Sequence, residues 1–189
     1  MKTKKISHLI CLILFLTQMS SPSYSQPKTE PSQNQMIYKN ISYGFQFGYP
    51  KGSKLREKEK GETHIELYIN EARTNLIRFS LKVTVFDKNQ KNGSGVATRP
   101  GSVPSTSTAV KKGENIFLKE LFLERGAGHS NQSVLYSIEK ENLIIQFYFQ
   151  IKTMNPDVVE PPLNPYNEKL ALEIMEQIVS SFQWIPETR

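Results

Sequence analysis

Beyond the first 25 residues, two histidines, His64 and His129, are the side chains that could act as a base in nucleophilic catalysis. Ser130 follows His129, and a serine hydroxyl activated by a nearby imidazole is a common hydrolase nucleophile. Neither histidine has a second one two or four residues away, as a shared metal site would need. We therefore expect a protein that is not an enzyme and has no cofactor or metal. The alternative is a small envelope hydrolase or lipid-handling enzyme that uses His129.

Basic side chains that could bind an acidic partner gather in one stretch, 88–113. The stretch is rich in Gly, Ser, Thr, Pro, Lys and Asn and has no aromatic residue, a composition typical of a flexible loop. We predict one long flexible loop, which serves either as a plain connection or as a basic arm for an acidic protein or lipid headgroups. The candidate partner-binding residues are Lys88, Lys91, Arg99, Lys111, Lys112 and, in a glycine-rich turn over 126–131, His129.

Nucleotide and nucleic-acid binding are not indicated by the sequence. The glycine-rich stretches 93–95 and 126–128 lack the Gly-Lys-Ser/Thr ending and the strand-to-helix setting of a phosphate-binding loop. Nucleic-acid surfaces interleave basic and aromatic side chains, and the nearest such set, Arg78, Lys82 and Tyr68, is sparse. We expect no nucleic-acid partner.

The segment 1–25 has the pattern of a secretory signal peptide, with three early lysines followed by an apolar run. The centre of this run, 9–16, is shorter than the ~20 residues that a membrane span needs. Ser23 and Ser25 supply small residues before a cleavage site. We predict export, with a periplasmic or extracellular location after cleavage. An uncleaved anchor is the alternative.

Cleavage after residue 25 would leave one domain without a thiol, because Cys11 is the only cysteine. This excludes disulfides and thiol catalysis in the mature chain. Three lysines and no acids leave with the segment, so the net charge falls from +6 to +3. The remainder is long enough for a sizeable core. We expect a flexible linker over 26–35 and a single α+β domain over 36–186.

Alternation of apolar and polar residues predicts an antiparallel sheet of about six to seven strands. The strand 43–49 is expected to stop at Pro50, which has no amide hydrogen to donate. The most apolar segment, 143–151, is expected to cross the middle of the sheet. The six clear strands are expected at 43–49, 64–70, 76–87, 115–125, 133–140 and 142–151. A weak strand near Leu55, a short edge strand at 36–38 and a closing strand at 182–185 are expected beside them.

One C-terminal helix is expected over 166–181, packed on one face of the sheet. Its apolar residues recur at helical spacing, while glutamates and lysine occupy the other side. Four prolines in 155–165 exclude a helix interior there and predict an extended crossing into this helix. The aromatic residues of 40–50 are expected to form the first layer of the core against the helix.

Three features together resemble the PsbP-like family: Tyr-Gly-Phe at 43–45 with Tyr-Pro at 49–50, a meander of alternating strands, and Ile-Val-Ser-Ser-Phe at 178–182. This family is named for an extrinsic lumenal protein of photosystem II and includes many exported bacterial proteins. The resemblance implies an antiparallel sheet with helices on its faces. Members often carry a tryptophan shortly after the Tyr-Pro, and 51–53 has none. No functional residue of the photosystem protein carries over, so neither photosystem binding nor calcium or chloride retention is implied.

We therefore expect an exported, non-enzymatic binding or accessory protein. Its partner would be a protein or another envelope component, with peripheral membrane contact as a further mode. Another alternative is a small apolar ligand held between sheet and helix, in a cavity lined by Phe45, Phe147, Phe149 and Trp184. The sequence does not define the partner or the oligomeric state.

Overall fold

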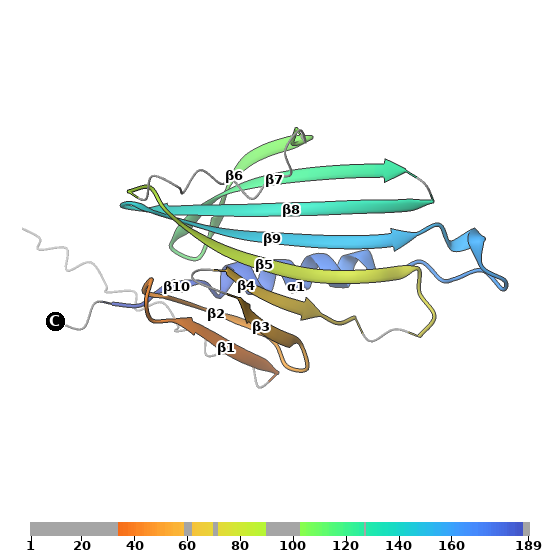
Figure 1. Cartoon of the computed structure of the whole chain (residues 1–189), viewed down its shortest axis with the longest axis horizontal. Coiled ribbons are helices and arrows are strands. Elements are labelled where there is room, and N and C mark those ends of the chain that lie inside the picture. Colours follow the sequence, from red (N-terminus) through yellow and green to blue (C-terminus); the bar gives the residue numbers. More distant parts are fainter. Residues whose placement is uncertain (1–33, 59–61, 70–71, 90–102, 127, 187–189) are drawn as a thin grey trace, which may run out of the picture.

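The computed structural model describes residues 34–58, 62–69, 72–89, 103–126 and 128–186 (Figure 1). The predicted signal peptide, residues 26–33 of the predicted linker, Lys91 and Arg99 lie outside the described residues. Within them the chain forms a seven-stranded antiparallel sheet, a three-stranded sheet and one α-helix near the C-terminus. The predicted fold class, α+β with an antiparallel sheet and a C-terminal helix, is confirmed.

The larger sheet has the strand order β3-β4-β5-β9-β8-β7-β6, and neighbouring strands are antiparallel throughout. Its central strand is β9, as predicted from the apolar segment that forms it. Three strands separate β5 from β6, although β6 follows β5 in the chain. The strands are β3 (Lys54–Lys58), β4 (Glu62–Leu67), β5 (Leu76–Asp87), β6 (Thr106–Lys112), β7 (Asn115–Gly126), β8 (His129–Lys140) and β9 (Leu143–Met154).

The smaller sheet is built around β2 (Phe45–Pro50), with β1 (Gln35–Asn40) on one side and β10 (Gln183–Trp184) on the other. The chain enters β2 through Gly44, whose φ of +65° is a conformation that other residues rarely adopt. β2 ends at Pro50, as predicted. The first and last strands of the domain therefore lie in one small sheet.

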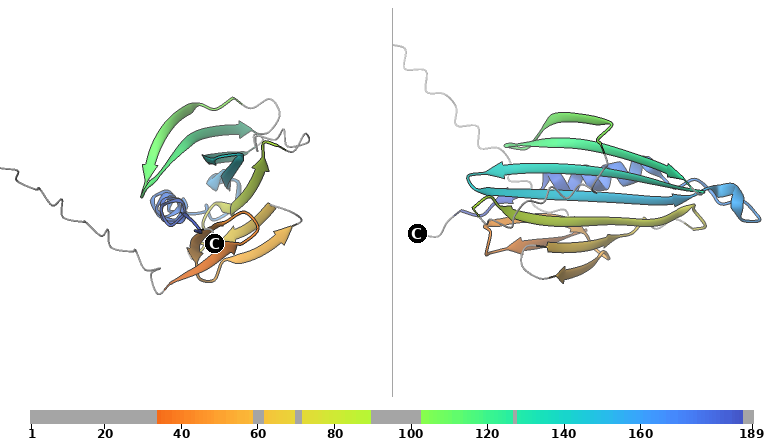
Figure 2. Two further views of the ribbon diagram at one scale, coloured as in Figure 1. Left: turned by 90° about the vertical axis from the view of Figure 1, so that its left-hand side faces the viewer. Right: turned by 45° about the horizontal axis from the view of Figure 1, so that its top comes forward.

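Helix α1 (Glu168–Ser180) lies on the concave side of the larger sheet, as the end-on view shows (Figure 2). It begins after a short 3₁₀ turn, η1 (Pro156–Val158), and an extended segment. The side chain of Asn167 caps the helix by accepting a hydrogen bond from the amide of Leu170 at 3.0 Å. Its buried side is formed by Ala171, Ile174, Met175, Ile178 and Val179.

Phe182 follows the helix and joins the two sheets. Its ring centroid lies 5.9 Å from that of Phe45 in the smaller sheet and 5.7 Å from that of Phe147 in the larger one. Trp184 packs against it at 5.1 Å. Phe45, Phe147 and Phe149 are fully buried among such side chains. The alternative prediction of a ligand cavity between sheet and helix is therefore wrong, because Phe182 and its neighbours fill that space.

Two segments expected to be loops or turns are strands. Thr106–Lys112 form β6, so 88–113 is not one long loop. These residues pair with β7 along their whole length, and Val110 packs against the core. The turn expected over 126–131 is shorter, because residues from His129 onward already belong to β8. In both cases hydrogen bonds to a neighbouring strand outweigh a local composition that favours loops.

Candidate functional site

The described residues of the predicted partner-binding set lie at two ends of the larger sheet. Lys88, Lys111 and Lys112 are at the end where β5 and β6 finish, whereas His129 is at the opposite end. Lys88 forms an ion pair with Glu139 of β8. Lys111 is exposed on β6, and Lys112, the next residue, faces the other side of that strand. The structure therefore does not bring these residues into one patch.

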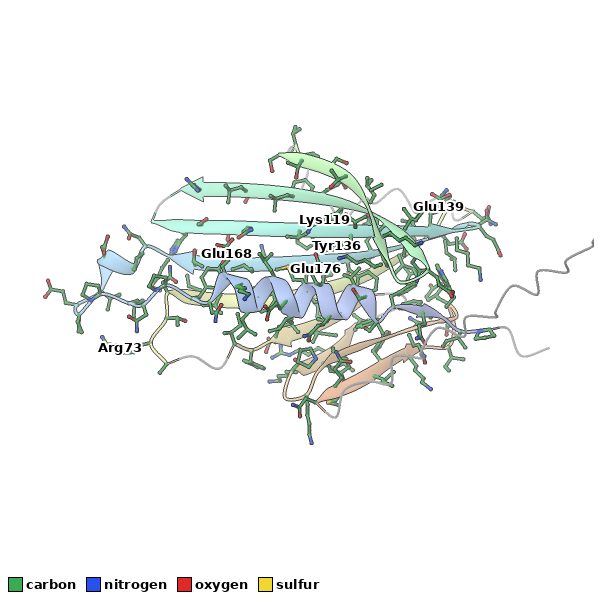
Figure 3. All side chains as sticks on the ribbon, turned by 180° about the vertical axis from the view of Figure 1, so that it is seen from behind. Arg73, Lys119, Tyr136, Glu139, Glu168 and Glu176 are labelled. Carbon is green, nitrogen blue, oxygen red and sulfur yellow. The ribbon has the colours of Figure 1, made fainter. Side chains whose placement is uncertain are left out.

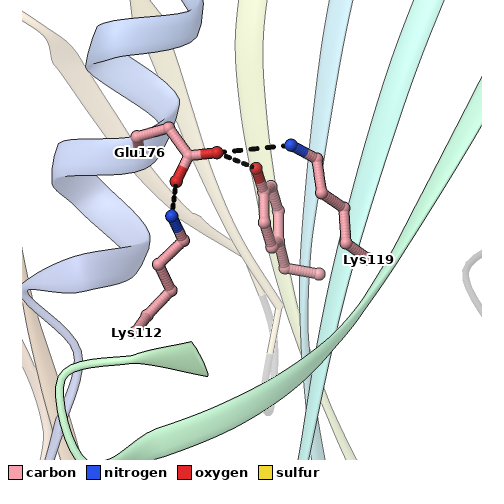
Figure 4. Close-up of polar contacts among 4 residues, drawn as sticks. Lys112, Lys119 and Glu176 are labelled. Carbon is pink, nitrogen blue, oxygen red and sulfur yellow. Dashed lines mark hydrogen bonds and ion pairs between the residues drawn. The ribbon is translucent and has the colours of Figure 1, made fainter. Parts of the chain in front are cut away.

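A polar cluster around Glu176 of α1 engages Lys112 on the inner face of the sheet (Figure 4). One carboxylate oxygen of Glu176 forms an ion pair with Lys112 Nζ. The other accepts a hydrogen bond from the Tyr136 hydroxyl at 2.8 Å and lies 3.3 Å from Lys119 Nζ. Because these three partners come from β6, β8 and β7, one helix carboxylate ties three strands to α1.

The surroundings of Glu176 keep its carboxylate ionised. Burial alone would raise the pKa of Glu176, but hydrogen bonds from Lys112, Tyr136 and Lys119 outweigh it and lower the pKa below its ordinary value. Burial, together with the hydrogen bond to Glu176 and the charge of that residue, raises the pKa of the Tyr136 hydroxyl far above its usual range. Glu176 is thus ionised and Tyr136 is a neutral donor at neutral pH, so the cluster is well suited to hold the β6–β7 hairpin in place.

His129 begins β8 at an exposed corner of the sheet, opposite Gly126 on β7 and Met154 on β9. Consecutive residues of a strand point to opposite faces, so the side chains of His129 and Ser130 diverge. Among the residues that the structure describes, none forms a hydrogen bond with the His129 ring. This geometry gives no support to a nucleophile activated by His129.

A cavity of about 490 Å³, open to solvent, lies where β4 ends and β5 begins. Two arginines, Arg73 and Arg78, line it together with Tyr68. Glu66 also lines it, but its carboxylate is engaged by Arg56 at 3.4 Å and by the Tyr68 hydroxyl at 3.3 Å. The rest of the lining includes the apolar side chains Leu67, Ile69, Leu76, Ile77 and Phe79. We call this cavity the arginine pocket.

Arg73 is held at the pocket by the segment that leads from β9 to α1. Its φ of +54° lies in the left-handed region, which non-glycine residues adopt rarely and mostly where surrounding structure imposes it. The amide of Asn164 donates to the Arg73 carbonyl at 3.1 Å, and Arg73 Nη2 donates to the Pro161 carbonyl at 3.3 Å. Figure 3 shows Arg73 at one end of the molecule, well away from Glu176.

Arg78 lies on β5 directly opposite Lys152 of β9. The register shifts between Leu76 and Arg78, so Ile77 has no partner on β9. Arg78 and Lys152 carry like charges, and like charges opposite each other destabilise a sheet. Neither Arg78 nor Lys152 has an ion pair with a carboxylate in the part of the chain that the structure describes. The pocket therefore carries positive charge that the described residues do not neutralise.

Asn75 fastens the segment that carries Pro161 and Asn164 to the sheet. Its side-chain amide donates to the Met154 carbonyl at 3.0 Å, and its side-chain oxygen accepts from the Tyr166 amide at 3.0 Å. We predict that Asn75→Ala lowers the free energy of unfolding by about 1–3 kcal/mol, because two half-buried backbone groups lose their partners. Urea denaturation of the purified domain measures this change.

Asn164→Ala is the matched control, because the hydrogen bonds recorded for exposed Asn164 use its backbone. This control is expected to shift the free energy of unfolding by less than about 0.5 kcal/mol. Equal losses in the two variants would contradict the role assigned to the Asn75 side chain.

No group of three or more His, Cys, Asp or Glu side chains among the described residues is placed to hold a metal ion. Within the portion of the chain described by the structure, no helix is both long and apolar enough to cross a membrane.

The sequence alone does not predict this pocket, for a physical reason. Arg78 and Tyr68 belong, with Lys82, to the sparse basic and aromatic set of the sequence, but Arg73 joins them only in the folded chain. The segment that fixes this turn follows β9, about 90 residues later in the chain, as the Arg73 to Pro161 bond shows. A local pattern therefore carries no signal for it.

Comparison with known proteins identifies similar folds. No protein-family model matches the chain, and no curated protein matches its sequence. One matching solved structure is a crystal structure of a protein from Bacteroides thetaiotaomicron VPI-5482, with 11% identity and a TM-score of 0.52. The match covers 82% of this chain and 50% of that one, so this chain spans half the length of that protein.

A second matching structure is the solution structure of cyanobacterial PsbP (CyanoP) from Synechocystis sp. PCC 6803. It has 11% identity and a TM-score of 0.42, and the match covers 80% of this chain and 92% of that one. At 11% identity, the likeness to the Bacteroides protein concerns the fold and not a shared site or function.

Proposed function

We propose that this chain is an exported, non-enzymatic accessory protein that binds a protein partner through the outer face of its β6–β7 end. This surface, the β6–β7 surface, consists of Ala109 and Lys111 on β6 and of Ile116 and Leu118 on β7. Ile116 is 67% exposed and Leu118 is 45% exposed. Lys111 lies directly opposite Ile116, and Ala109 lies opposite Leu118. This exposed apolar pair, beside a lysine that has no ion pair with a described residue, is the observation that carries the proposal.

The neighbouring strand edge favours an extended partner segment. β6 is an edge strand that pairs with β7 alone among the described strands. An open edge can accept a further strand, with backbone hydrogen bonds that supply affinity and side-chain contacts that supply specificity. Lys111, which has no ion pair with any described residue, favours an acidic residue in that segment.

The polar cluster supports binding by holding the surface rigid. The ion pair between Lys112 and Glu176 and the contact between Lys119 and Glu176 fix both strands of the hairpin to α1. A preformed edge loses less conformational freedom when a partner binds than a mobile loop does. Lys112 thus contributes by positioning the strand, while Lys111 faces the partner.

Site-specific photo-crosslinking in the native host tests the proposed surface. A photoreactive amino acid at Leu118 is expected to capture one recurrent protein, whereas the same group at Leu123 is the matched control. Leu123 is on the same strand and 50% exposed, but lies toward its other end. Adding Ile116→Glu should lower the crosslinking yield at position 118 by about tenfold, because it places a charge in the apolar pair.

Equal capture from positions 118 and 123, or capture unaffected by Ile116→Glu, would contradict the protein-binding surface. Capture of lipid alone would assign the surface to the membrane instead.

Export is tested by cell fractionation of the full chain against a variant without residues 2–25. The full chain is expected outside the cytoplasm and the shortened one inside, and a full chain retained in the cytoplasm would refute export.

A further inference from the structure

We propose that the arginine pocket binds a small amphipathic anion, with a carboxylate or phosphate head joined to a short apolar body. This site is separate from the β6–β7 surface, which lies at the other end of the larger sheet. The inference rests on three properties of the pocket: two arginines that form no ion pair with a described residue, an apolar wall, and the hydrogen bonds that hold Arg73.

The anionic head is assigned from the two guanidinium groups. A guanidinium presents several N–H donors in a planar fork that matches carboxylate and phosphate oxygens. Arg73 uses one of these donors on the Pro161 carbonyl, and the others remain available. Arg78 faces Lys152 across the strands, so an anion bound at Arg78 would also relieve this repulsion.

The apolar body is assigned from the remaining wall. Ile77 lines the pocket and is 43% exposed, because the irregular pairing of β5 leaves it without a cross-strand neighbour. Ile69 and Leu76 line the same cavity and are half-buried. A free phosphate or acetate would leave this surface in water, whereas a short alkyl chain would cover it.

The size and the frame of the pocket fit a ligand of this class. A volume of about 490 Å³ lies within the usual range for small-molecule sites. Arg73 is held in place by one backbone hydrogen bond, which its carbonyl accepts from the Asn164 amide, and by the bond that its guanidinium donates to the Pro161 carbonyl. The Glu66 carboxylate, already engaged by Arg56 and Tyr68, is directed to partners within the protein. The head group would therefore meet one guanidinium, that of Arg73, that is held in place before binding.

Isothermal titration calorimetry on the folded chain tests this proposal with defined probes. Octanoate and octyl phosphate represent the two head groups, acetate and inorganic phosphate lack the body, and octyltrimethylammonium reverses the charge. We expect binding of at least one of the two amphipathic anions. The three other probes should bind at least about tenfold more weakly, because each lacks either the charge-assisted hydrogen bonds or the apolar contact.

Variants distinguish the pocket from general surface charge. Arg73→Gln and Arg78→Gln should each weaken binding of the amphipathic anion by about tenfold, the usual effect of losing a charge-assisted hydrogen bond. Ile77→Ser should weaken the binding of octanoate and leave the weak binding of acetate unchanged. Arg125→Gln is the matched control, since Arg125 is an exposed arginine on β7 that does not line the pocket. Thermal unfolding confirms that each variant is folded.

The proposal is overturned if no amphipathic anion binds, or if inorganic phosphate binds as tightly as octyl phosphate. It is also overturned if both pocket variants bind the anion as Arg125→Gln does. These results are independent of the crosslinking at Leu118, so the failure of one site can be told from the failure of the other.

Discussion

Replacement of Phe182 by alanine is expected to lower the free energy of unfolding by about 3–5 kcal/mol. Phe182 is 2% exposed, and its ring meets Phe45, Phe117, Phe147 and Trp184 at centroid distances of 5.1–5.9 Å. Removing the ring opens a cavity at the point where the two sheets meet. Urea denaturation followed by circular dichroism measures the loss.

Tyr68→Ala is the control for Phe182→Ala, because it removes an aromatic ring that is 57% exposed. It should change the free energy of unfolding by less than about 1 kcal/mol. The conservative variant Phe182→Leu should lose less than the alanine variant, since it leaves a smaller cavity. A loss below about 1 kcal/mol for Phe182→Ala would show that the sheets do not depend on this ring.

Replacement of Glu176 by glutamine is expected to lower the free energy of unfolding by about 1–3 kcal/mol. The change leaves the charges of Lys112 and Lys119 unpaired and weakens the acceptor of the Tyr136 hydroxyl. The loss is smaller than for a fully buried pair, because the Glu176 side chain is 34% exposed. Chemical denaturation at pH 7 measures it.

Glu173→Gln is the matched control on the same helix. Its carboxylate meets only the exposed Lys169, at 3.8 Å, among the ion pairs recorded for the described residues. Exposed helix pairs of this kind contribute little, so the control should lose less than about 0.5 kcal/mol. Similar losses at positions 173 and 176 would refute the anchoring role of the cluster.

The pH dependence of stability provides a second test of Glu176. Its pKa is lowered in the folded chain from an ordinary value of 4.5. The carboxylate therefore stabilises the fold fully above that value, and this contribution is lost as the pH falls through the folded-state pKa. Denaturation at pH 7, 5, 4 and 3 should show a smaller gap between the native chain and Glu176→Gln at the acid end. A constant gap would contradict the assignment.

Local patterns predicted those elements whose side chains alternate cleanly. The period-2 runs of β4, β5, β8 and β9 and the helical spacing of α1 predicted these elements to within a few residues. The centre of the sheet followed from the apolar residues of β9. Such segments bury one face wherever they lie, so their conformation is set by their own residues.

Elements that depend on distant neighbours could not be predicted from local sequence patterns. β6 has a polar, loop-like composition and becomes a strand through its pairing with β7. The division into two sheets was also missed, because it depends on the pairing of β2 with β10. The candidate sites also depend on contacts between residues far apart in the chain, because Pro161 holds Arg73 and Glu176 holds Lys112.

The pairing of β2 with the last strand, β10, has a consequence for the order of events during synthesis. Gln46 on β2 and Gln183 on β10 are joined by a side-chain hydrogen bond of 3.0 Å across 137 residues of chain. Closing so long a loop is slow and comes late in folding. The core also stays incomplete until Phe182 has been made. The growing chain thus completes its core only after residues 182–184 have left the ribosome, an order that suits the export that we propose.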